Sequence, residues 1–227
     1  MNSFAEFRDA YQYRGDKIYQ LIYERHKYSL RGKRPEVVVR NLKLIFEHSF
    51  MISEQRGFYA MSLRDLSNSS QLSIGAVYGC INSKNDIPNI ACDTISFLHT
   101  EFLQRYQQDN ASHEVLMSHI RNSVYLAEIL DSWFRFLIQE VKHLDVKSRI
   151  CVSSLDRSHE QVLSALISGQ RDSSISNDAL LETEMIPRAV KSFIHQWCLR
   201  NDEYKQHGIT VDQYATSLVN LVAKLFK

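Results

Sequence analysis

The chain has 227 residues, enough for one or two domains with a substantial buried core. Glycine and proline are scarce, with seven and three residues, and no stretch alternates apolar and polar residues for long, which favours an all-α fold. The formal net charge is only +1, so any surface that binds nucleic acid has to be local.

The cysteines and the hydropathy pattern indicate a cytoplasmic protein. Cys80, Cys92, Cys151 and Cys198 are far apart and show no Cys-x-x-Cys spacing, which is typical of reduced, packed thiols. The sequence shows no signal peptide and no apolar run of membrane-spanning length, so we expect no membrane partner.

Residues 1–33 form an N-terminal extension. Apolar residues recur at helical spacing in two groups, around Phe4 and Phe7 and around Ile18 and Ile22, so we expect one or two amphipathic helices. Helices of this kind pack on their own protein or on a dimer partner, or they make a second contact with DNA or another protein. Both interpretations stay open at this point.

A basic segment, Arg31-Gly32-Lys33-Arg34-Pro35, follows the extension. Its residues resemble the Arg/Gly/Pro core of AT-hook segments, which insert into A·T-rich minor grooves. Basic arms next to a DNA-binding helix also commonly reach the minor groove. We therefore predict minor-groove contacts for Arg31, Lys33 and Arg34, and the alternative is a solvated linker.

A long helix followed by two short ones is predicted next. Pro35 suits the first turn of the long helix, and Gly57 is a plausible C-cap. Ser62 and Ser73 are N-cap candidates for the two short helices, neither of which can bury its apolar face alone. Three helices in this order predict a helix-turn-helix DNA-binding domain over residues 34–88.

The same segment resembles the TetR-type bacterial transcription regulators. Two features depart from the family pattern: Gln71 stands where a Gly is usual in the turn, and Cys80-Ile81 replaces a pair of aromatic residues. If Gln71 has a positive φ, it carries a strain of ~1 kcal/mol or more. The residues that carry the resemblance are Ile45, Phe46, Arg56, Gly57, Phe58, Ser62, Asp65, Leu66, Ser73, Gly75, Tyr78, Ser83, Lys84 and Asp86.

The expected DNA-reading face follows from helix geometry and from the resemblance. If Val77 and Ile81 point inward, the residues between them point outward and present few long donors for base contacts. Tyr78 and Lys84 resemble family positions that hold phosphates, and Ser62 begins a helix that could do the same. The predicted DNA-binding residues are Arg31, Arg34, Ser62, Arg64, Ser73, Ile74, Gly75, Ala76, Tyr78, Asn82 and Lys84.

Residues 89–227 are predicted to form a helical domain for effector binding and dimerisation. We expect helices that end near residue 108, and then over residues 112–144, 145–169, 179–200 and 210–226, with a turn at 107–110 and a polar loop at 173–178. An apolar stripe on the last helix has no later element to cover it. The resemblance implies that the last two helices pair with their twins in a homodimer.

The sequence contains no motif that indicates catalysis, a metal site or a cofactor. The leading hypothesis is a repressor that binds a palindromic double-stranded operator and is released by a small, largely apolar effector. A loose likeness to TetR-type repressors of lipid degradation suggests an acyl-CoA-like effector. The alternative is a DNA-binding protein of this fold that acts through a protein partner without an effector. The predicted effector-binding residues are Phe102, Tyr125, Trp133, Phe134, Leu137, Phe193 and Trp197.

Overall fold

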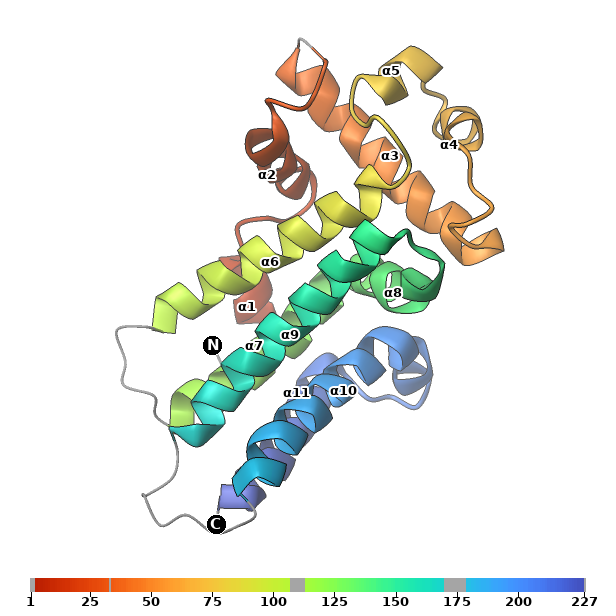
Figure 1. Ribbon diagram of the computed structural model, residues 1–227. Helices are drawn as coiled ribbons and strands as arrows, with labels where there is room; N and C mark the ends of the chain where they lie inside the picture. The colour runs from red at the N-terminus through yellow and green to blue at the C-terminus, as the bar shows by residue number, and fades with distance from the viewer. Residues whose placement is uncertain (1–2, 33, 107–112, 170–178, 227) are drawn as a thin grey trace. The chain divides into compact units, whose positions relative to one another are not determined.

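The structure is a computed structural model that describes residues 3–32, 34–106, 113–169 and 179–226 (Figure 1). These residues contain eleven α-helices and two short 3-10 helices and no strand, so the all-α prediction is confirmed. The turn predicted at residues 107–110 and the loop predicted at 173–178 lie outside the described residues. No described helix is both long and apolar enough to cross a membrane.

The chain divides into two compact units. Unit 2 comprises residues 11–97 and 135–153, and unit 1 comprises residues 1–10, 98–134 and 154–227. The elements in chain order are α1 (Phe4–Ala10), α2 (Asp16–His26), α3 (Pro35–Arg56), α4 (Leu63–Ser70), α5 (Ile74–Tyr78), α6 (Asp86–Tyr106), α7 (His113–Ile129), α8 (Asp131–Glu140), η1 (Val141–His143), α9 (Val146–Ser168), α10 (Ala179–Gln206), α11 (Val211–Ala223) and η2 (Lys224–Phe226).

In unit 2, helix α3 is the central element, and α2, α4 and α5 pack against it. Its inner face is fully buried at Leu42, Ile45 and Phe46, and the short helices contribute Leu66 and Val77 to the same core. Each such side chain stabilises the fold by about 1.5–3 kcal/mol. The predicted helix ends are confirmed, since α3 begins at Pro35 and Gly57, with φ 82°, caps its C-terminus.

In unit 1, helix α7 is the central element, and α1, α10 and α11 pack against it. Phe4 and Phe7 of α1 place their rings 5.6 and 5.5 Å from the ring of Tyr125 on α7. Asp212 at the start of α11 accepts hydrogen bonds from the Phe4 N–H, at 2.7 Å, and from the Tyr125 hydroxyl, at 2.5 Å. The first part of the extension is therefore a helix docked on its own chain.

The single helix predicted over residues 112–144 is wrong, because the chain breaks at Leu130 into α7 and α8. The carbonyl of Leu130 accepts hydrogen bonds from the N–H groups of Trp133 and Phe134, at 3.0 and 3.1 Å, and so begins a new helix. Apolar residues continue through the break without Gly or Pro, so the periodicity does not reveal it.

The C-terminal helices also differ in detail from the prediction. Helix α10 runs on to Gln206 through a kink at Arg200, whose φ is −133°. The apolar stripe predicted on the last helix is divided between two faces: Leu218 and Val222 are buried, whereas Leu221 and Leu225 are 47% and 53% exposed. Helix α7 covers the buried half, and the exposed half stays available for another contact.

Candidate nucleic-acid interface

Helix α4 is fixed at its start by a capping box. The Ser62 hydroxyl accepts a hydrogen bond from the Asp65 N–H at 3.1 Å, and the Asp65 carboxylate accepts one from the Ser62 N–H at 2.9 Å. The Ser62 hydroxyl also donates a hydrogen bond to the Asp65 carboxylate at 2.6 Å. This bond, the bond from the Ser62 N–H and the Arg56 guanidinium, 3.0 Å from the carboxylate, lower the pKa of Asp65 to about 2. The Ser62 hydroxyl is engaged in this cap, while Arg64 beside it is exposed.

The turn between α4 and α5 contains the strained residue that the sequence indicates. Gln71 has φ 56° and ψ 23°, so the strain expected for a positive φ at this residue applies. The hydroxyl of Ser67 donates to the Leu72 carbonyl at 2.6 Å, and that of Ser70 donates to the Leu66 carbonyl at 2.6 Å. These bonds hold the turn in place against a local strain of about 1 kcal/mol.

Helix α5 presents a small, mostly apolar face to solvent. The Ser73 hydroxyl caps it by accepting a hydrogen bond from the Ala76 N–H at 3.2 Å. Val77 points into the core, whereas Ile74 and Tyr78 are 41% and 44% exposed. The exposed DNA-binding candidates are Arg31, Arg34, Ser62, Arg64, Ser73, Ile74, Gly75, Tyr78 and Asn82, and Ala76 and Lys84 are half-buried.

The basic segment is attached to the residue that follows helix α5, Gly79, which the sequence did not indicate. The N–H groups of Arg31 and Gly32 both donate to the Gly79 carbonyl, at 3.0 and 3.1 Å. Glycine is required at position 32, because a Cβ there would lie 2.3 Å from the Cγ2 atom of Val38. Arg31 is therefore held beside α5 instead of lying on a free arm. Lys33 lies outside the described residues.

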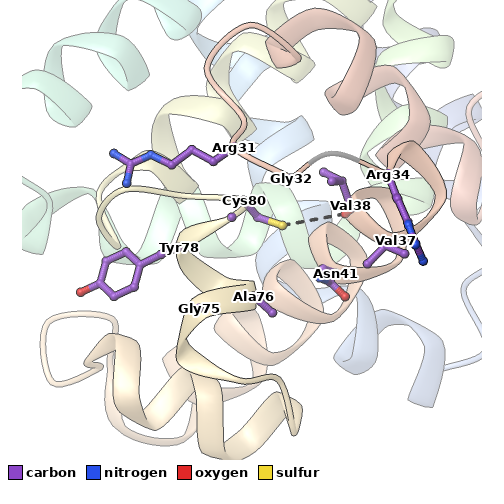
Figure 2. A pocket seen from close by; sticks show the side chains of 11 residues that line it. Arg31, Gly32, Arg34, Val37, Val38, Asn41, Gly75, Ala76, Tyr78 and Cys80 are labelled. Carbon is purple, nitrogen blue, oxygen red and sulfur yellow. Dashed lines mark hydrogen bonds between the residues drawn. The ribbon is translucent and has the colours of Figure 1, made fainter.

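A groove of about 580 Å³ separates the basic segment and the start of α3 from α5 (Figure 2). The side chains of Arg31 and Tyr78 extend toward the same side of this view, and those of Arg34 and Val37 toward the other. Val37 and Asn41 of α3 also line the groove, although sequence reasoning did not select them. Two guanidinium groups and a phenol thus surround a shallow apolar floor, which suits contact with a phosphate backbone.

Lys84 lies in a different environment from the other candidates. Its ammonium donates hydrogen bonds to the carbonyls of Phe58, Tyr59 and Met61, at 3.2, 2.7 and 2.9 Å. Burial lowers the pKa of Lys84, but the lysine stays charged at neutral pH because its ordinary value is high. The three carbonyls engage its three donors, so a phosphate contact requires the ammonium to leave at least one of them.

Most predicted effector-binding residues are packed side chains. Tyr125, Trp133, Phe134 and Trp197 are buried in unit 1, and Leu137 is buried in unit 2. The Trp197 indole donates to the Glu128 carboxylate at 3.0 Å and stacks on the Tyr204 ring with centroids 5.9 Å apart. Phe193 is 42% exposed, and the side chain of Phe102 lies outside the described residues.

The described residues are all-helical and contain a capped helix-turn-helix, and comparison with solved structures identifies the fold. Fatty acid degradation regulator FadR from Bacillus halodurans matches with a TM-score of 0.61 and 13% identity over 84% of this chain and 95% of that chain. PfmR, a TetR family transcriptional regulator from Thermus thermophilus, matches with a TM-score of 0.56 and 20% identity over 78% and 96%. FadR from Bacillus subtilis in complex with stearoyl-CoA matches with a TM-score of 0.56 and 14% identity, over 79% of this chain and 96% of that chain.

No family model and no curated protein matches the sequence. The chain therefore has the fold of TetR-type regulators, which confirms the resemblance of its helix-turn-helix segment at the level of the fold.

Proposed function

We propose that the protein is a DNA-binding transcription regulator that works in the cytoplasm as a homodimer. Residues 34–88 would bind one half of a palindromic operator, and residues 89–227 would dimerise and bind an effector. The observation that carries this proposal is the outward face of α5, where Ile74 and Tyr78 are exposed beside an arginine held in place through the Gly79 carbonyl. A core helix of an ordinary globular protein does not need such a face.

Recognition on this face divides into base and phosphate contacts. Ile74 and Ala76 offer apolar surface for thymine methyl groups, while Gly75 lets the backbone approach the base edges closely. Tyr78, Arg31 and Arg34 surround the groove and reach phosphates, which contribute affinity without sequence information. Arg34 is the N-cap residue of α3 and is the candidate for the minor-groove contact predicted for the basic segment, since the backbone of Arg31 is tied to Gly79 after α5.

The direct test has two parts. Sequencing of genomic fragments retained by the purified protein should yield a palindromic site, and titrations on that site should then compare variants. Arg31→Ala and Tyr78→Phe should weaken binding to all sequences alike, and loss of one charge should flatten the log–log salt dependence by about one unit per half-site. Arg157→Ala, which removes an exposed arginine from unit 1, is the matched control.

Fragments without a shared site, or equal affinities for Arg31→Ala and Arg157→Ala, would refute the assignment of this interface. Lys84→Met separates the two roles of that lysine. If Lys84 only ties the carbonyls of residues 58–61 together, the variant loses stability but keeps the salt slope of the wild type.

We propose further that DNA binding represses transcription and that a small, largely apolar effector, such as an acyl-CoA-like lipid metabolite, releases the protein. Support comes from the fold shared with a regulator in complex with stearoyl-CoA and from the aromatic residues of unit 1. An effector should raise the melting temperature by mass action and lower operator affinity. Stearoyl-CoA is the probe, and stearate and free coenzyme A are its controls.

A protein partner in place of an effector is the second candidate. Helix α2 leaves a groove of about 880 Å³ against α3, lined by Tyr23, Val39, Leu44 and charged residues of both signs. Tyr125 and Trp197 already have full packing and hydrogen-bond partners without a ligand. A protein that binds its operator but shows no melting shift with stearoyl-CoA or other lipid thioesters would favour this candidate.

A further inference from the structure

Asn41 is a polar residue on the apolar face of α3. It follows Val38 by three positions and precedes Ile45 by four, so helical geometry places it on the same inner face as these two core residues. Asn41 is only 5% exposed. Its Oδ1 atom is buried and has no hydrogen-bond partner in the part of the chain that the structure describes. An amide therefore occupies a position that a leucine of similar size could fill.

The other buried polar residues of α3 have partners. The Ser49 hydroxyl donates to the Ile45 carbonyl at 2.6 Å, and the Ser53 hydroxyl donates to the Glu140 carboxylate at 2.7 Å. A buried polar group without such a partner destabilises the fold, because it loses its bonds to water and gains none in return. A polar residue at such a position is a candidate for a functional group.

Asn41 lines the groove between the start of α3 and α5 (Figure 2). The wall that faces α3 is made of small residues, namely Gly75, Ala76 and Gly79. A Cβ at Gly75 would meet no atom within 4 Å, so the space beside this wall is open. The groove, of about 580 Å³, thus has room for a small polar group next to the Asn41 amide.

The polar side chains that line this groove are all able to donate hydrogen bonds. Besides the amide of Asn41, they include two guanidinium groups and a phenol, from Arg31, Arg34 and Tyr78. No carboxylate is among the described residues that line it, whereas three carboxylates line the groove beside α2. A set of donors with two positive charges matches a phosphate group, which is anionic and accepts hydrogen bonds.

We propose that the Asn41 amide donates a hydrogen bond to a phosphate of the DNA backbone that enters this groove, and so fixes the position of α5 on the duplex. The inference rests on the proposed function and adds to it a contact that is neutral and recessed. Phosphates are the outermost groups of a duplex and can reach a recessed donor, whereas base edges lie within the grooves of DNA. Asn41 therefore contributes affinity without reading sequence.

The test is a set of titrations of the full chain on its operator and on a duplex of random sequence, each over a series of salt concentrations. Asn41→Leu should lower affinity for both duplexes alike by about tenfold or more, as expected for the loss of a hydrogen bond to a charged group. Its salt dependence should equal that of the wild type, because a neutral amide releases no counterion. Its denaturation midpoint should be equal or higher, since the buried Oδ1 atom without a partner is removed. Asn41→Asp should instead flatten the salt dependence by about one unit per half-site, because its carboxylate offsets one cation of the interface.

Asn89→Leu is the matched control. Asn89 lies on α6 in the same unit, and its Oδ1 atom is also buried without a partner. Its Nδ2 atom donates to the Asn85 carbonyl at 2.8 Å, and it does not line the groove, so this variant should bind both duplexes as the wild type does. Calorimetry with inorganic phosphate at matched ionic strength tests a free anion as the ligand, and we expect no saturable binding below millimolar concentration.

The outcomes separate this inference from the proposed function. If Arg31→Ala weakens DNA binding and Asn41→Leu does not, the inference fails and the proposed function stands. Equal losses in Asn41→Leu and Asn89→Leu, or a loss confined to the operator, would also overturn it. Tight binding of inorganic phosphate that Asn41→Leu abolishes would assign the groove to a free anion instead. A wild type that binds neither duplex would refute the proposed function and this inference together.

Discussion

Replacement of Gly32 by alanine tests whether the basic segment is held against the recognition helix. The new Cβ would lie 2.3 Å from the Cγ2 atom of Val38, which is 2% exposed near the start of α3. A helical valine has one strongly preferred rotamer, so it cannot turn away cheaply. The backbone of Arg31 and Gly32 must therefore shift, and the Gly79 carbonyl loses the hydrogen bonds from their two N–H groups.

The expected cost follows from these contacts. Overpacking of a buried site typically costs about 1–3 kcal/mol, and a lost hydrogen bond costs about 0.5–1.5 kcal/mol. A segment that moves relieves the clash while it gives up its bonds, so the two costs do not add in full. We expect a loss of about 2 kcal/mol in the free energy of unfolding, or a melting temperature lower by roughly 4–8 °C.

A double-mutant cycle with Val38→Ala tests whether the clash with Val38 causes the loss of stability in Gly32→Ala. Val38→Ala removes the Cγ2 atom, so Gly32→Ala should cost little in that background, and operator affinity lost in Gly32→Ala should return in the double variant. Gly75→Ala is the control for stability alone, because its Cβ would meet no atom within 4 Å, and its operator affinity is not compared since Gly75 belongs to the proposed DNA-binding face. An equal loss of stability from Gly32→Ala in both backgrounds would refute the clash.

Three other predictions concern pH, strain and assembly. Burial lowers the pKa of His99 to about 4 and of His119 to about 3, and that of His159 falls well below its usual value with help from its charged neighbours. Below pH ~6.5 the unfolded chain therefore binds more protons than the folded chain. As the pH falls from there to the folded pKa values, the free energy of unfolding should decrease by up to about 1.4 kcal/mol per pH unit for each histidine. A denaturation midpoint that stays constant between pH 6.5 and 4.5 would contradict this. Gln71→Gly should raise the melting temperature by a few degrees, since glycine adopts the left-handed conformation freely and relieves about 1 kcal/mol of strain. An unchanged or lower melting temperature would show that the Gln71 side chain stabilises the fold by more than the strain destabilises it. Leu221→Glu should shift the sedimentation of a dimer toward monomer, because this leucine is 47% exposed on α11, and a wild type that sediments as a monomer at micromolar concentration would remove the dimer from the proposal.

Features encoded by neighbouring residues were predictable. Ser62 and Asp65, three positions apart, encode the capping box, and both of its hydrogen bonds are present. Strain at Gln71 was expected only for a positive φ, because a Gly is usual at this place in TetR-type turns, and Gln71 does have φ 56°. The burial of Val77 follows from helical period. In each case the physical cause acts within one or two helical turns, so the sequence contains it in full.

Features that depend on distant backbone or on convergence of separate helices were not predictable. The Gly79 carbonyl accepts hydrogen bonds from the N–H groups of Arg31 and Gly32, and backbone groups carry no residue-specific signal. His119 and His159 come from different helices, and their rings lie 5.6 Å apart in the core, a contact that their separation in the sequence does not indicate.

The docking of α1 has a consequence for biosynthesis. Its partner Asp212 lies 208 positions farther along the chain, so α1 leaves the ribosome long before the helix that receives it has been made. At ~5–20 residues per second, the delay is roughly 10–40 seconds. Phe4 and Phe7 lack Tyr125 for the first part of this time and α11 for all of it, so their cover is incomplete until synthesis of α11. Attachment of α1 is therefore a late step of folding, and it is completed only in chains whose helix α11 has already formed.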